Sequence, residues 1–270
     1  MAFMSRELRV LIRGIGDVAS AVAHRLFRAG YPVVTHSTPQ PTATRRGMAF
    51  ADAVFDGETI LEGVRAVRVD KVDAVAEVLA GLASIPVLVG KWETLLTVVL
   101  PQVLIDARMR KREHPETQLG VAPLTIGLGP NFLAGETTDV VVETSWERLG
   151  DVVIRGASLP LQGEPRAIAG HARDRYVYAP VGGTLHTALK VGGRVHAGEV
   201  VAHIDTTPLT APLGGVLRGL TRDGVPIAAE TKVIEVDPRG RPELVCGLGE
   251  RPARIAESVL QVLERTTKVS

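Results

Sequence analysis

The chain has 270 residues, of which 45% are hydrophobic and 23% charged, and its 31 basic and 30 acidic residues give a formal charge of +1. This composition is typical of a folded chain of about two domains and excludes a disordered one. The near-neutral charge excludes a general attraction to nucleic acids or acidic membranes, and an aromatic content of 4% leaves few surfaces on which single strands could stack.

The first predicted elements are a strand, a glycine turn, a helix and a second strand. Residues 8–12 are an apolar run typical of a buried strand, and apolar residues recur at helical spacing from Val18 to Ala29. Gly30 follows at the position where glycine commonly ends a helix, and residues 31–35 predict the next strand. This order predicts a βαβ unit.

The same alternation continues to about residue 158. A helix is predicted over residues 72–82, and further strands are predicted over residues 64–69, 86–89, 103–107, 124–128 and 140–143. Strands separated by helices favour a mostly parallel sheet that is covered on both faces. Residues 1–158 therefore predict an α/β, Rossmann-like domain.

A different pattern follows a linker predicted over residues 159–176. The segment APVGGTL at 179–185 recurs as APLGGVL at 211–217, an offset of 32 residues. Each half contains short strands and glycine turns, and halves this short must pack on each other to bury a sheet face. Residues 177–240 therefore predict a small pseudo-twofold all-β domain. An amphipathic C-terminal helix is predicted over residues 250–268.

The repeat is similar to the barrel-sandwich domains that carry biotin or lipoate. A carrier domain needs a lysine at the hairpin between its halves, but residues 205–209 contain none, and no lysine lies between Lys190 and Lys232. The sequence therefore predicts a docking or capping domain without a carrier function.

The Gly14–Gly16 turn stands where a strand passes into a helix. Backbone N–H groups and the helix dipole make such a position suitable for a phosphate, and the two glycines permit close approach of the backbone. We therefore predict that this turn holds a phosphate-containing ligand. The predicted contact residues are Gly14, Ile15, Gly16, Asp17 and Val18.

The sequence leaves open which phosphorylated ligand would bind at this turn. No acidic residue stands about 20 positions further on to bind a ribose diol, and Asp17 places a negative charge beside a pyrophosphate, which disfavours NAD. Arg45 and Arg46 could hold the 2′-phosphate of NADP or the phosphate of another ligand. Asp17 could instead cap the helix.

More polar residues follow other strands of the predicted sheet. Ligands of open α/β sheets bind outside the carboxyl ends of the strands, so these residues predict a crevice for an anionic ligand. The residues expected there are Asp106, Arg108, Gly127, Gly129 and Asn131. Lys111 and Arg112 would add positive charge.

Several segments together resemble the accessory proteins of selenium-dependent molybdenum hydroxylase systems. They lie at residues 10–46, 49–54, 106–111, 126–135, 141–144, 149–150, 179–180, 237–240 and 246. The resemblance implies a Rossmann-type domain in a protein that serves the maturation of a molybdenum hydroxylase. It also implies as partners the hydroxylase or its maturation machinery, and as ligand the molybdenum cofactor, a phosphorylated pterin. The chain departs from the family's pattern at Ser37 and at residues 145–148.

Two other functions stay open: an NADP-dependent oxidoreductase, and a Rossmann-like interaction protein with a vestigial site. The chain has no nucleophile elbow or P-loop lysine that would decide whether it is an enzyme. The spacing of His186, His196 and His203 matches no metal-ligand pattern, so no metal site is predicted.

The single cysteine, Cys246, excludes an intrachain disulfide. It could carry a persulfide, although a buried, inert thiol is the favoured interpretation. Residues 1–7 lack the apolar stretch of a signal peptide, and no run reaches about 18 apolar residues. We therefore expect a cytoplasmic protein, with homo-oligomerisation left open.

Overall fold

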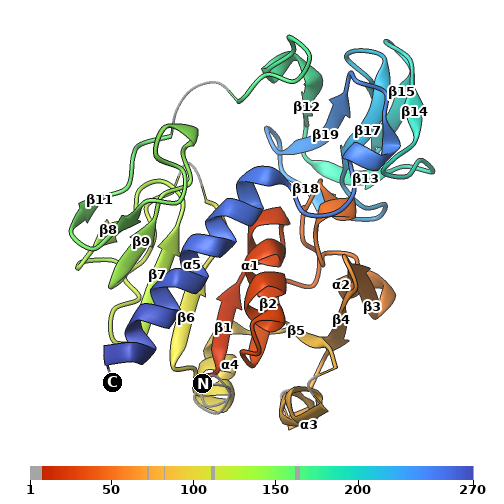
Figure 1. Cartoon of the computed structure of the whole chain (residues 1–270). Coiled ribbons are helices and arrows are strands. Elements are labelled where there is room, and N and C mark those ends of the chain that lie inside the picture. Colours follow the sequence, from red (N-terminus) through yellow and green to blue (C-terminus); the bar gives the residue numbers. More distant parts are fainter. Residues whose placement is uncertain (1–7, 72, 82, 111–112, 162–164, 270) are drawn as a thin grey trace.

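The structure is a computed structural model that describes residues 8–71, 73–81, 83–110, 113–161 and 165–269 (Figure 1). The N-terminal residues considered for a signal peptide lie outside this description, as do Lys111 and Arg112. No helix among the described residues combines the length and the apolar character needed to cross a bilayer.

A nine-stranded sheet forms the first layer of the fold, in the order β10-β9-β7-β6-β1-β2-β5-β4-β3. The pairs β1–β2, β1–β6, β2–β5, β4–β5, β6–β7 and β7–β9 are parallel, and the edge pairs β3–β4 and β9–β10 are antiparallel. The expectation of an α/β chain with a mostly parallel sheet is confirmed. The strands are β1 (Val10–Arg13), β2 (Val33–Ser37), β3 (Glu58–Leu61), β4 (Val64–Val69), β5 (Ile85–Val89), β6 (Val103–Asp106), β7 (Leu124–Leu128), β9 (Val140–Val142) and β10 (Val152–Val153).

Helices cover both faces of this sheet. On one face α1 and α5 lie side by side, as Figure 1 shows, and their apolar residues join Val10 and Ile12 of β1 in one core. On the other face α3 and α4 pack against Leu11, which points the opposite way because side chains alternate along a strand. The helices are α1 (Asp17–Arg28), α2 (Ala53–Asp56), α3 (Asp73–Gly81), α4 (Trp92–Val99) and α5 (Glu250–Val269).

The C-terminal β unit contains two four-stranded antiparallel sheets, β12-β19-β17-β14 and β16-β15-β13-β18. The strands β13, β14 and β15 recur 32 residues later as β17, β18 and β19, so each sheet contains strands from both repeats. The strands are β12 (Tyr176–Tyr178), β13 (Gly183–His186), β14 (Arg194–Val195), β15 (Val200–Ile204), β16 (Thr207–Thr210), β17 (Gly215–Leu220), β18 (Pro226–Ile227) and β19 (Lys232–Asp237).

Some elements differ from the sequence-based expectations. Helix α4 and strand β3 were not predicted, since each is short and carries several exposed positions. The two-stranded sheet of β8 (Leu133–Ala134) and β11 (Gly156–Ala157) occupies part of the predicted glycine loop and ends just before the linker. Helix α5 begins at Glu250, as expected.

Polar contacts attach the C-terminal β unit to the loop that follows β2. The Leu220 amide donates to the Thr44 carbonyl at 2.9 Å, and Arg46 Nε donates to the Leu220 carbonyl at 2.9 Å. Arg222 forms an ion pair with Asp56 at the end of α2. The two parts of the chain therefore meet beside the start of α1.

Two equivalent glycines of the repeat lie where a side chain does not fit. A Cβ on Gly215 would lie 2.3 Å from the backbone oxygen of Asp237, and one on Gly183 would lie 2.3 Å from Asp205 Oδ2. A Cβ on the neighbouring Gly214 would lie 3.8 Å from its nearest atom, an ordinary contact. The close strand packing of the repeat therefore depends on Gly215 and Gly183.

We expect Gly215→Ala to lower the free energy of unfolding by about 2 kcal/mol or more, because the backbone of β19 must move. Gly214→Ala is the matched control and should change it by no more than about 0.5 kcal/mol. Urea denaturation of both variants measures the difference. Equal stabilities would contradict this account of the repeat.

Candidate functional site

The Gly14–Gly16 turn connects β1 to α1 at the carboxyl edge of the parallel strands. Gly14 has a φ of +125°, and a Cβ there would lie 3.0 Å from the Ala107 carbonyl oxygen. Gly14 is therefore required by the packing of two loops. Gly16 is different, because no atom other than those of Gly16 and its two chain neighbours lies within 4 Å of the place of its Cβ. The open space of the turn lies at Gly16.

The side chain of Asp17 occupies the start of α1. Its Oδ1 accepts a hydrogen bond from the Val18 amide at 3.0 Å, and its Oδ2 accepts one from Arg45 Nη1 at 2.9 Å. Burial raises the pKa of Asp17, but the charges of Arg45, Lys232 and Arg251 more than offset this and hold it below its ordinary value. A carboxylate thus stands where the sequence predicts a ligand's phosphate.

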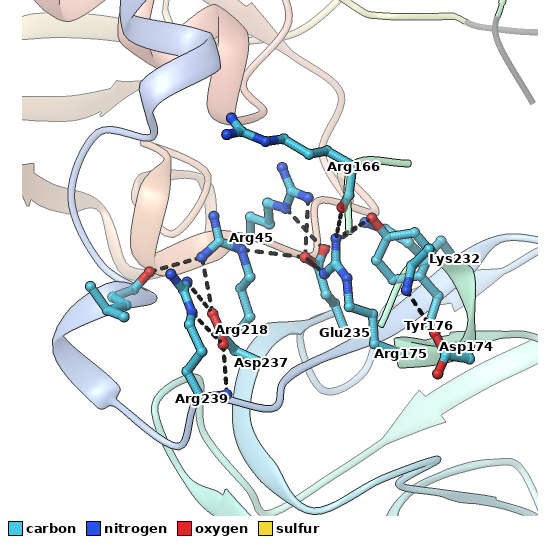
Figure 2. Close-up of polar contacts among 12 residues, drawn as sticks. Arg45, Arg166, Asp174, Arg175, Tyr176, Arg218, Lys232, Glu235, Asp237 and Arg239 are labelled. Carbon is cyan, nitrogen blue, oxygen red and sulfur yellow. Dashed lines mark hydrogen bonds and ion pairs between the residues drawn. The ribbon is translucent and has the colours of Figure 1, made fainter. Parts of the chain in front are cut away.

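Arg45 links this carboxylate to the C-terminal β unit. Its Nε and Nη2 donate to the two carboxylate oxygens of Glu235 at 2.9 and 3.1 Å, the fork geometry that arginine makes with a carboxylate. Glu235 is fully buried in β19 and also accepts from Arg175 at 2.5 Å and from Lys232 at 2.9 Å (Figure 2). One buried carboxylate therefore receives three cationic side chains.

We call Arg45, Arg175, Arg218, Lys232, Arg239, Asp17, Glu235 and Asp237 the interface cluster. It contains five cations and three carboxylates, so positive charge is in excess. Arg175 Nε and Arg218 Nε are buried without a hydrogen-bond partner, and the second lies 3.3 Å from Glu235 outside hydrogen-bond geometry. Burial lowers the pKa of Lys232, and the charge of Arg45 contributes to the shift. The cluster therefore combines an excess of positive charge with two unpaired donor atoms.

Arg46 belongs to a separate set of contacts. Besides the Leu220 carbonyl, it binds Asp52 through Nη1 at 2.6 Å. Both arginines that the sequence assigned to a 2′-phosphate are therefore engaged by groups of the chain itself. Their role in ligand binding stays a prediction.

A second group forms at the ends of β1 and β6. Asp106 is buried and accepts from Arg108 Nε at 2.9 Å and from Gln118 Nε2 at 2.6 Å. Arg108 also donates to Glu116 at 2.8 Å, and Arg13, the last residue of β1, donates to the same carboxylate at 2.7 Å. Asp106 and Arg108 thus lie together at the ends of these strands. Their neighbours Arg13 and Glu116 were not expected from the sequence.

The glycine segment after β7 supports the loop that carries this group. A Cβ on Gly127 would lie 2.3 Å from the Phe132 ring, and Gly129, with a φ of +120°, faces Met109. Asn131 Nδ2 donates to the Glu113 carbonyl at 3.0 Å. The structure therefore gives a packing role to Gly127 and Gly129, and a hydrogen-bonding role within the loop to Asn131.

Several charged residues near both groups were missed. Arg13, Arg110 and Glu116 belong to the second group, and only the position of Arg13 at the end of a strand could have indicated it. The rings of Trp92 and His36 lie beside Arg13 and beside each other. No local sequence pattern indicated that Arg175, Lys232 and Glu235 belong to the interface cluster. Cys246 is exposed, so the interpretation of a buried thiol is wrong. The described residues contain no cluster of three or more His, Cys, Asp or Glu side chains able to hold a metal.

Comparison with known proteins gives one clear relative. The chain is 38% identical over 257 residues to the uncharacterized protein YqeB of Escherichia coli strain K12, covering 94% of this chain and 47% of YqeB. The chain thus spans about half the length of this relative. No family model matches.

The similar solved structures share little of the fold. A succinylglutamate desuccinylase/aspartoacylase from Rhodobacter sphaeroides is 28% identical, with 23% of this chain and 22% of that one covered and a TM-score of 0.21. The ectoine utilization protein EutE (DoeB) from Ruegeria pomeroyi is 13% identical, with 76% and 57% covered and a TM-score of 0.23. Such low scores carry no argument about function.

The buried position of Glu235 predicts a large effect of its removal. Glu235→Gln removes the buried carboxylate that Arg175, Lys232 and Arg45 share, and Arg175 is itself buried, so we expect a loss of about 3–5 kcal/mol in the free energy of unfolding at pH 7. Glu58→Gln, which removes an exposed partner of Arg65, should cost no more than about 1 kcal/mol. Guanidinium denaturation measures both.

The pH dependence gives an independent check. Burial opposes ionisation of Glu235, but Arg45 and Lys232 hold its pKa well below the ordinary value of 4.5. Its stabilisation is therefore complete above pH 4.5 and is lost as the pH falls through the lower, folded-state pKa. The stability difference between the wild type and Glu235→Gln should shrink over that range. A difference independent of pH would contradict the ionised state of Glu235.

Proposed function

We propose that the chain serves the maturation of a molybdenum hydroxylase by binding the anionic group of a phosphorylated ligand at the Gly14–Gly16 turn. The family resemblance described above supports the process, and the place of the turn supports the site. In the sheet order, β2 lies on one side of β1 and β6 on the other, so the direction of winding reverses beside the turn. Ligands of Rossmann-like sheets bind at this kind of reversal.

The observation that carries the proposal is the positive charge around the start of α1. Arg45, Lys232 and Arg251 all act on Asp17, and Arg251 Nε is held by the Thr144 carbonyl at 2.7 Å. The C-terminal β unit, which we infer to be a barrel-sandwich-like module, supplies Lys232. A phosphate at Gly16 would thus meet cations from both parts of the chain.

The cationic residues fit the phosphate of a molybdenum cofactor, and the open space at Gly16 fits its approach. Asp17 does not fit a bound phosphate, because its carboxylate already accepts a hydrogen bond from the Val18 amide. A bound phosphate would have to take over the contact with Arg45 and displace the Asp17 side chain. When bound, the cofactor would supply a metal-binding dithiolene, while these residues would hold and orient its phosphate.

A second candidate is a Rossmann-like interaction protein whose turn is closed by its own side chains. The hydrogen bonds of Asp17 to Val18 and Arg45 favour it. The contacts of Arg45 with Glu235 and of Arg46 with Asp52 do not distinguish the 2′-phosphate of NADP from another phosphate, so no observation favours NADP.

Gly16→Ala tests the proposal directly. The added methyl group enters open space, so the fold should be unaffected while the approach of an anionic group is blocked. Gly81→Ala, also in open space, is the matched control. We expect a phosphorylated pterin to stabilise the wild type and the control by about 2.7 kcal/mol at 100 times its Kd, and Gly16→Ala much less.

The stabilisation is measured as the shift in melting temperature, and the same thermal-shift series includes NADP, NAD and adenosine monophosphate. Stabilisation by NADP alone would contradict the proposal and favour an oxidoreductase. No stabilisation by any of these ligands would favour the interaction protein. Equal stabilisation of both variants by the pterin would place its binding elsewhere than at Gly16.

A further inference from the structure

Three arginines converge on one carboxylate at the carboxyl ends of β1 and β6. Arg13 Nη1 and Arg108 Nη2 donate to Glu116 Oε1 at 2.7 and 2.8 Å, and Arg110 donates to Oε2. We call Arg13, Arg108, Arg110, Asp106 and Glu116 the arginine cluster. It lies on the face of the sheet that α4 covers, since Arg13 packs 4.0 Å from the ring centroid of Trp92. The Gly14–Gly16 turn leads into α1 on the opposite face.

Arg13 is the residue whose bonding is incomplete. Its side chain is only 10% exposed, yet its buried Nε has no hydrogen-bond partner. Burial lowers the pKa of Arg13, and the nearby charge of Arg108 lowers it further. A guanidinium that is buried, unpaired at one nitrogen and repelled by a second guanidinium is a site short of anionic partners.

Glu116 supplies that partner from a loop. Its side chain is 46% exposed, much more than those of the arginines that it binds. Burial raises its pKa and is the largest single influence, but the hydrogen bonds from Arg110, Arg108 and Arg13 together hold it well below the ordinary value, so the carboxylate is ionised at neutral pH. An exposed side chain loses little packing when it leaves, and an anionic ligand would replace its hydrogen bonds to the three arginines.

The charges define what could replace Glu116. The cluster contains three arginines and two carboxylates, and Asp106 is fixed by Arg108 and by Gln118. A further carboxylate, that of Glu113, binds Arg110 at 3.1 Å at the edge of the cluster. Departure of Glu116 would leave the three arginines with Asp106 and Glu113, an excess charge of one. A phosphate carries a charge of about −1.5 to −2 at neutral pH, and its oxygens match the fork of N–H groups on an arginine.

We propose that Glu116 is an internal substitute for a tetrahedral dianion, which displaces it and binds to Arg13, Arg108 and Arg110. The ligand class is inorganic phosphate or the phosphoryl group of a phosphate monoester. This site is distinct from the Gly14–Gly16 turn and does not rest on the function proposed above.

Glu116→Gln tests the proposal with a side chain of the same size. Removal of the competing carboxylate should tighten the binding of inorganic phosphate roughly tenfold, because the binding-competent state becomes the populated one. Glu58→Gln is the matched control: Glu58 is 52% exposed and also binds an arginine, Arg65. Titration calorimetry at constant ionic strength and pH 7 should give the control the affinity of the wild type. Equal affinities for all three proteins would overturn the proposal.

Stability provides a second measurement that needs no arginine variant. Glu116→Gln leaves the three arginines with only Asp106 and Glu113, so its melting temperature at low salt should fall below that of Glu58→Gln. Phosphate should restore it more than sodium chloride of equal ionic strength. Equal restoration by the two salts would show general screening and overturn the site.

Arg13→Lys in the Glu116→Gln background identifies the binding residue. Lysine keeps the charge but lacks the planar fork, so the gain in phosphate affinity should be largely lost. A retained gain would contradict the role of Arg13. Adenosine monophosphate separates the two sources: binding of phosphate alone supports a free oxyanion, and binding of both supports a phosphate monoester.

Discussion

The contact of Arg45 with Glu235 and Asp17 is the interaction on which the arrangement of the chain depends. Arg45 and Glu235 are 190 positions apart in the sequence, and Arg45 and Asp17 are 28 positions apart. The contact connects the start of α1 to the centre of the C-terminal β unit. Removing charges from water is costly, and a buried ion pair offsets this only when its hydrogen bonds are well formed. The bidentate contact of Arg45 with Glu235 meets that condition, and it fixes the C-terminal β unit beside the Gly14–Gly16 turn.

Both groups at the carboxyl edge bring several arginines together around carboxylates of the chain. In each one, a side chain of the protein stands where we propose that an anionic ligand binds: Asp17 in the interface cluster and Glu116 in the arginine cluster. The four buried polar side-chain atoms without a partner in the described part of the chain are Arg13 Nε, Gln118 Oε1, Arg175 Nε and Arg218 Nε, two beside each group. The fold therefore concentrates unmet bonding capacity at this edge.

Sequence patterns predicted the parts of the structure that local spacing determines. The βαβ unit and the strands of the repeat follow from apolar periodicity and glycine turns, and the 32-residue offset required no knowledge of contacts. The clusters could not be predicted in this way, because Arg13 and Glu116 are 103 positions apart and their pairing depends on the order of strands. The sequence placed Asp106 and Arg108 at the correct edge because they directly follow a buried strand.

The residues that carry the family resemblance differ in how far the fold alone accounts for them. Glu143 is buried, and its carboxylate accepts from the amides of Thr144, Ser145 and Leu159, so it satisfies backbone groups after β9. Gly14 and Gly127 are required by close packing. Arg108 is different, because a buried carboxylate needs one counter-charge and Asp106 lies among three cations. The ligand proposed for the arginine cluster would give Arg108 a role beyond its pairing with Asp106.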